Sequence, residues 1–211
     1  MRVLVACEYS GTVRDAFTRL GHYALSCDVL PTDRPGLHYQ GDVRDILYQD
    51  WDLLIGHPPC TDLAVSGAKH FAAKIADGRQ GRALDFVRLL MDAPIERICI
   101  ENPVSVISSH IRKPDQIIQP YWFGHEATKT TCLWLKNLPP LTPTNMVDKG
   151  ARHVTKSGKS LPEWYNLPPS PDRWKLRSAT FPGIAAAFAS QWGSLLKEEK
   201  GSLKYGQLEL F

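Results

Sequence analysis

The sequence predicts an α/β fold in which helices cover both faces of a mostly parallel, twisted sheet. Short apolar runs bounded by Gly, Pro or Asp alternate along the chain with segments of helical spacing. This β-α-β-α alternation is typical of parallel strands joined by crossover helices. Residues suited to binding or chemistry follow four of the apolar runs, and these are Asp28, Asp42, Cys60 and Glu101. Because ligands bind at the carboxyl ends of the strands in such sheets, the four residues predict a site at that edge.

The expected elements alternate in the order that this fold requires. Predicted strands cover residues 3–7, 23–27, a short stretch before Gly41, 52–56, 97–100, 117–121 and 131–135. Predicted helices cover residues 12–20, 79–91 and 184–196, each with apolar residues at helical spacing. Gly21 ends the first of these helices, as a glycine just past a helix C-terminus commonly does.

Composition restricts the classes of protein that need to be considered. The 211 residues suffice for one good-sized domain, and the 43% of apolar and 22% of charged residues are ordinary for a globular protein. No apolar run approaches the roughly 20 residues of a membrane helix, and the first residues lead directly into Glu8 without a small-residue cleavage site. We therefore expect a strand there instead of a signal peptide, and a cytoplasmic protein.

The five cysteines are scattered singly, without a CxxC pair. This spacing favours reduced thiols over disulfides or zinc, and we expect no metal site. The net charge of +3 does not by itself indicate a nucleic-acid partner.

Two segments at the expected edge have residues that could carry chemistry. The prolines of His57-Pro58-Pro59-Cys60 end the strand and would hold an exposed Cys60 as a nucleophile. The alternative is a small buried residue in a proline turn. Glu101 would lie beside this loop if the two strands are neighbours, and the alternative is an acidic residue at the start of a helix.

Residues 141–177 differ from the rest of the chain. They are rich in proline and carry seven Lys or Arg residues against three acids, with Trp164, Tyr165 and Trp174 between them. We predict an irregular, basic and aromatic loop region on a rigid scaffold. The alternative is an ordinary solvated loop whose tryptophans pack onto the core.

The order of these motifs resembles that of the cytosine-5 DNA methyltransferases, over roughly residues 3–135. Residues 52–60, Asp-Leu-Leu-Ile-Gly-His-Pro-Pro-Cys, are similar to the strand and Gly-Gly-Pro-Pro-Cys-Gln motif that hold the family's nucleophile, and Leu63-Ala-Val-Ser66-Gly67 follows them. Glu101-Asn102 is similar to the family's Glu-Asn-Val. The segment 123–131, Phe-Gly-His-Glu-Ala-Thr-Lys-Thr-Thr, resembles Tyr-Gly-x-Pro-Gln-x-Arg-x-Arg. The resemblance is to a divergent and compact member, of phage type by its small size.

The resemblance implies a Rossmann-like, S-adenosylmethionine-dependent methyltransferase fold and a role for each matching residue. The catalytic residues would be Cys60, Glu101 and Lys129. S-adenosylmethionine would be bound by Glu8, Tyr9, Ser10, Gly11, Asp28, Asp42 and Pro58. DNA, either flipped or single-stranded at the target base, would be contacted by Pro59, Ser66, Asn102, Arg173 and Arg177.

The resemblance also implies a mechanism. Cys60 would add to carbon 6 of cytosine, Glu101 would hold ring nitrogen 3 and the exocyclic amine with a raised pKa, and carbon 5 would receive the methyl group. The expected organisation is a catalytic core at 1–140, the basic loop region 141–177 in place of a target-recognition domain, a returning helix at 178–197 and a charged tail at 198–211. So short a recognition region predicts low sequence specificity or a partner protein that supplies it.

Departures from the family motifs leave two alternatives open. The glycine-rich Phe-x-Gly-x-Gly loop is Ala-Cys-Glu-Tyr-Ser at residues 6–10, and Lys129 stands for an arginine. The first alternative keeps the fold and the cysteine chemistry but transfers another group or acts on RNA or a nucleotide. The second is a catalytically inactive methyltransferase-like protein that binds DNA.

Overall fold

The computed structural model describes residues 1–170 and 173–195, and Trp174 without its side chain. The seven-stranded sheet has the order β3-β2-β1-β4-β5-β7-β6, in which the first five strands are parallel and β7 runs antiparallel to both of its neighbours. Its strands are β1 (Arg2–Ala6), β2 (Tyr23–Asp28), β3 (His38–Gln40), β4 (Leu53–Gly56), β5 (Arg97–Pro103), β6 (Gln116–Ile118) and β7 (Thr131–Lys136). The predicted α/β fold class is confirmed, and it is the architecture that the methyltransferase resemblance implies.

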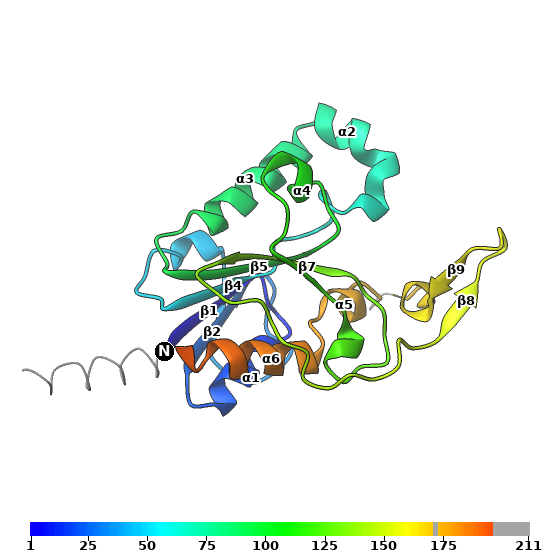
Figure 1. The fold of residues 1–211 in the computed structure, drawn as a ribbon. Helices are drawn as coiled ribbons and strands as arrows, with labels where there is room; N and C mark the ends of the chain where they lie inside the picture. Colours follow the sequence, from blue (N-terminus) through cyan, green and yellow to red (C-terminus); the bar gives the residue numbers. More distant parts are fainter. Residues whose placement is uncertain (171–172, 196–211) are drawn as a thin grey trace, which may run out of the picture.

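Helices cover both faces of the sheet because alternate side chains of the strands point to opposite sides. Val3 and Val5 of β1 pack in one core with α1 (Thr12–Arg19) and α6 (Pro182–Trp192). Leu4 of the same strand packs in the other core with α3 (Arg79–Met91) and α4 (Ile107–His110). Figure 1 shows the two helical layers below and above the sheet.

Two arms project from this body on one side (Figure 1). The helical arm is a 3-10 helix, Val65–His70, followed by α2 (Phe71–Ala76). The hairpin arm pairs β8 (Arg152–Val154) with β9 (Ser160–Pro162). A 3-10 helix, Glu163–Asn166, and α5 (Arg173–Ser178) lead from the hairpin back to the body. The region predicted as an irregular loop, residues 141–177, therefore contains a short hairpin and two short helices between its loops.

Three other predicted boundaries differ from the structure. β5 continues to Pro103, because β7 still pairs with it after β4 has ended, so Glu101 lies within the strand and not after it. The strand predicted at 117–121 ends at Ile118, and Pro120 starts a 3-10 helix. α6 begins at Pro182, since proline suits the first turn of a helix.

The described residues contain no helix long and apolar enough to cross a membrane. The predicted charged tail, residues 198–211, lies outside the described residues, and so does the Trp174 side chain.

Candidate active site

The proline loop, residues 57–60, leaves the sheet at the carboxyl end of β4. The backbone N–H of His57 donates to the carbonyl of Ala6, 2.9 Å away, so the loop starts in register with β1. The side-chain amide of Asn102 donates to the Pro58 carbonyl at 2.8 Å, which ties the loop to β5. After the prolines, the N–H groups of Leu63 and Ala64 donate to the Cys60 carbonyl at 3.1 and 2.8 Å and form a turn. Cys60 therefore stands exposed at the sheet edge, whereas Cys27, Cys99 and Cys132 are buried.

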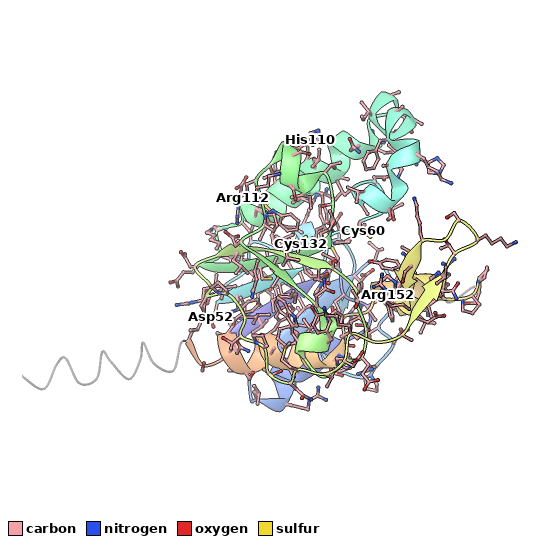
Figure 2. All side chains as sticks on the ribbon, turned by 45° about the vertical axis from the view of Figure 1, so that its right-hand side comes forward. Asp52, Cys60, His110, Arg112, Cys132 and Arg152 are labelled. Atoms are coloured by element: carbon pink, nitrogen blue, oxygen red, sulfur yellow. The ribbon has the colours of Figure 1, made fainter. Side chains whose placement is uncertain are left out.

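The thiol of Cys60 lies in the field of three charged side chains. Desolvation by the surrounding protein and the Glu101 carboxylate raise the pKa of Cys60, while the charges of Lys129 and Arg177 lower it. The net direction is upward, so the thiol form is favoured in the free protein. Figure 2 shows Cys60 on the side from which both arms project, with Asp52 at the opposite end of β4.

Glu101 is held by a histidine. Its Oε2 lies 2.9 Å from Nδ1 of His57, and 15% of its side chain is exposed. Burial raises the pKa of Glu101, but the hydrogen bond from His57 and the charges of His57 and Lys129 outweigh burial, so the pKa is lowered. The predicted raised pKa is therefore wrong for the free protein.

Lys129 joins this edge of the sheet to α5. Its Nζ donates to the Arg177 carbonyl at 2.8 Å and lies 5.6 and 5.8 Å from the ring centres of Trp164 and Phe181. Burial lowers the pKa of Lys129; Arg177 lowers it further, while Glu101 and Cys60 oppose this shift. The structure thus brings Cys60, Glu101, Lys129 and Arg177 together at one edge of the sheet.

The loop between β1 and α1 is closed by its own carboxylate. Oε1 of Glu8 accepts the N–H of Val13 at 2.6 Å, and Oε2 accepts the N–H of Arg14 at 3.2 Å. Ser10 donates to the same carboxylate, and Gly11 adopts a left-handed conformation ahead of the helix. Glu8 thereby occupies the N-terminus of α1, where phosphates bind in many doubly wound folds. A phosphate-bearing cofactor would have to displace a buried carboxylate there.

Tyr9 of this loop reaches α5. Its hydroxyl lies 2.8 Å from Oγ of Ser178 and donates to the Lys175 carbonyl at 3.2 Å. Nζ of Lys175 lies 3.5 Å from Asp33. The candidate cofactor loop and the candidate DNA-binding segment therefore touch through Tyr9.

Two carboxylates stand at the ends of the next strands. Asp28 ends β2, accepts the N–H of Leu30 at 3.0 Å, and has a pKa raised by burial. Asp42 follows β3 and accepts from the backbone and side chain of Arg44 at 2.9 and 2.7 Å. Desolvation raises the pKa of the Cys7 thiol, and the charges of Asp28 and Asp42 raise it further. Both carboxylates therefore lie near Cys7, at the end of β1.

This donor set fits an adenosyl group. Carboxylates at strand ends accept hydrogen bonds from ribose hydroxyls and from an adenine amine.

Among the residues that the structure describes, no group of three His, Cys, Asp or Glu side chains could hold a metal ion.

The remaining predicted residues lie in different surroundings. Pro58 is buried and Pro59 is exposed, while Ser66 is exposed on the helical arm. Asn102 is buried, and its contact with Pro58 anchors the loop. Arg173 on α5 donates to the Tyr165 carbonyl at 3.3 Å. Their predicted contacts with cofactor or DNA stay predictions.

The sequence interpretation overlooked His57. The sequence did contain a signal that could have drawn attention to it, because a histidine replaces the second glycine of the Gly-Gly-Pro-Pro-Cys motif.

Comparison with known proteins finds likeness in structure alone. No family model matches the sequence, and no curated protein matches it. One similar solved structure is a putative DNA modification methyltransferase encoded within an E. coli prophage, with a TM-score of 0.48 and 16% identity over 70% of this chain. Another is a methyltransferase of Entamoeba histolytica, with a TM-score of 0.48 and 17% identity over 72% of this chain. The chain spans 52% and 58% of their respective lengths, so it covers little more than half of each.

Proposed function

We propose that the protein is a DNA cytosine-5 methyltransferase with Cys60 as its nucleophile. The observation that carries this proposal is the meeting of an exposed thiol, a hydrogen-bonded carboxylate and a partly buried lysine at the carboxyl edge of β4 and β5. A thiol beside an acid and a cation suits addition to an electron-poor ring.

Each of the three residues has a task in this reaction. The Cys60 thiolate forms a bond to carbon 6 of the cytosine at the expense of the 5,6 double bond, which breaks the aromaticity and makes carbon 5 nucleophilic. After methyl transfer, water takes the proton from carbon 5, and the Cys60 thiolate leaves carbon 6 as the double bond is restored. Glu101 binds the amine edge of the ring. Lys129 stabilises the negative charge that develops on the ring and supports the thiolate of Cys60. The target base must be flipped or single-stranded to reach them.

S-adenosylmethionine would supply an electrophilic methyl group next to carbon 5. Asp28 and Asp42 would hold its adenosyl part, with the loop of Tyr9 to Gly11 alongside. The capping of α1 by Glu8 supports a cofactor without phosphates, because this carboxylate repels an anion at the helix N-terminus.

The two arms supply the DNA contacts in this proposal. The hairpin arm carries exposed Arg152, Lys156 and Lys159, and the helical arm carries exposed Lys69 and His70. Both arms lie on the side where Cys60 is exposed (Figure 2). Positive side chains there would meet the phosphates of a strand whose base enters the site.

Oligonucleotides containing 5-fluorocytosine test the proposal, because fluorine at carbon 5 prevents release of the cysteine after methyl transfer. With S-adenosylmethionine, we expect a denaturation-resistant adduct that increases the protein mass by the oligonucleotide and one methyl group. Cys60→Ser should form none, while Cys27→Ser, which changes a buried thiol, should retain it. Absence of the adduct from the wild type would contradict the proposal.

A further inference from the structure

His57 stands where the family motif that this chain resembles has a glycine. Its imidazole lies directly against Glu101, the proposed catalytic carboxylate. The backbone on both sides of its side chain is fixed, by the hydrogen bond from His57 to Ala6 and by the ring of Pro58. Only 11% of the His57 side chain is exposed. From this fixed backbone the imidazole faces Glu101, with Nδ1 2.9 Å from Oε2.

The hydrogen bond between His57 and Glu101 determines which carboxylate oxygen of Glu101 remains available for a ligand. A carboxylate is an acceptor, so Nδ1 of His57 carries the proton and donates to Oε2 of Glu101. Oε2 is thus committed to the histidine, and Oε1 is left to meet a ligand. One oriented oxygen is what an exocyclic amine needs from its acceptor.

The other ring nitrogen shows that stability alone does not explain this contact. Nε2 of His57 is buried and has no hydrogen-bond partner among the described residues. An unsatisfied buried polar atom costs about 1–3 kcal/mol. Glycine, the residue of the resembled motif, would remove that cost.

We propose that His57 is a positioning residue, which orients Glu101 so that Oε1 faces the target base and keeps the carboxylate ionised until the base is bound. This inference rests on the proposed function, because it assigns the task of Glu101 to recognition of the cytosine amine. His57 acts through Glu101 and does not itself touch the reacting atoms.

Other titratable groups surround the pair and remain in place when His57 is changed. They are Cys60 on the proline loop, Lys129 ahead of β7, Arg177 on α5, and the buried thiols Cys99 on β5 and Cys132 on β7. His57 contributes the hydrogen bond and a charge to the lowered pKa of Glu101. Its removal should therefore raise the pKa of Glu101.

The direct test is a titration of the glutamate carboxyl carbons by ¹³C NMR, with the Glu101 signal assigned from Glu101→Gln. His57→Gly should raise the midpoint of Glu101 clearly, and His57→Gln, which keeps a neutral donor, should raise it less. His153→Gln is the matched control, because His153 lies 3.6 Å from Glu163 and should leave Glu101 unchanged. A Glu101 midpoint that is the same in the wild type and both His57 variants would overturn the proposal.

A second measurement links the pair to the reaction. At pH values where Cys60 is already a thiol, the rate of 5-fluorocytosine adduct formation should fall further as Glu101 loses its charge, and this second fall should move to higher pH in both His57 variants. An unmoved fall would contradict the role of His57. If even the wild type forms no adduct, the proposed function fails, whereas the NMR titration still decides whether His57 controls Glu101.

Discussion

Cys60 is exposed, yet its pKa is raised by desolvation and by Glu101. Because only the thiolate attacks electrophiles, such a thiol is accessible but mostly protonated and unreactive near neutral pH. The Cys60 side chain of the free protein is therefore held mostly as the thiol, even though the charge of Lys129 opposes this.

Alkylation of Cys60 by iodoacetamide tests this balance of charges. The rate should rise with pH around a midpoint above that of an ordinary cysteine. Glu101→Gln removes a negative charge and should lower the midpoint, while Lys129→Met removes a positive charge and should raise it. Peptide mass spectrometry reads the modified site, and the buried Cys99 and Cys132 serve as internal controls that stay unmodified. Equal midpoints in all three proteins would show that these charges do not act on Cys60.

At the scale of residues, the sequence predicted where in the fold the candidate site residues lie better than it predicted which way their side chains point. It was possible to expect Cys60 and Glu101 at one edge, because both follow or lie within apolar runs of a parallel sheet. The link between His57 and Glu101 depends on the direction of two side chains across neighbouring strands. Neither apolar periodicity nor motif spacing contains that information.

At the scale of elements, α1 begins on an unusual cap. Glu8 satisfies two backbone donors of the first turn from a position ahead of Gly11. The sequence indicated Glu8 only as a candidate ligand for a cofactor, since a capping carboxylate three residues ahead of the N-cap Gly11 does not follow a local capping pattern.

Replacement of Glu8 tests the strength of this cap. Glu8→Ala should destabilise the protein by about 0.5–2 kcal/mol, as the loss of a helix N-cap does. Asp85→Ala, at an exposed position of α3, should change stability by less than about 0.5 kcal/mol. Urea unfolding followed by circular dichroism compares the two. Equal stabilities for Glu8→Ala and the wild type would refute the capping role.

The helical arm and the hairpin arm were not predicted as elements. Most of their residues are exposed, so neither arm shows the apolar period that predicts a helix or strand facing a core. What the composition did indicate was the positive charge of the second arm.

The lysines of the hairpin arm should determine the salt dependence of DNA binding. Replacement of Lys156 and Lys159 by Gln should weaken binding and reduce the slope of log affinity against log salt by roughly 0.9 for each phosphate of duplex DNA that is no longer neutralised. Lys113→Gln is the control, because Lys113 follows Arg112, which lies away from both arms (Figure 2). Fluorescence anisotropy over a series of salt concentrations measures both quantities. An unchanged slope would exclude the hairpin arm from the interface.

At the scale of the whole molecule, the order of elements was the most predictable property. Buried parallel strands produce continuous apolar runs, and these runs located β1, β2, β4 and β5. The antiparallel insertion of β7 between β5 and β6 was not predictable, because strand order is determined by long-range pairing and leaves no local pattern.

The proposed enzyme joins three parts at one edge of the sheet. They are a loop for a cofactor without phosphates, the Cys60 thiol with the neighbouring Glu101 carboxylate, and two arms that carry positive charge. Contacts of α5 with both Tyr9 and Lys129 connect these parts. Such an arrangement should transfer a methyl group to a base of DNA, and not only bind it.

Mass spectrometry of nucleosides from DNA incubated with the protein and S-adenosylmethionine measures this transfer directly. We expect 5-methyl-2′-deoxycytidine with the wild type and none with Cys60→Ser. Unmodified nucleosides, or a group other than methyl on carbon 5 of cytosine, would contradict the proposed function.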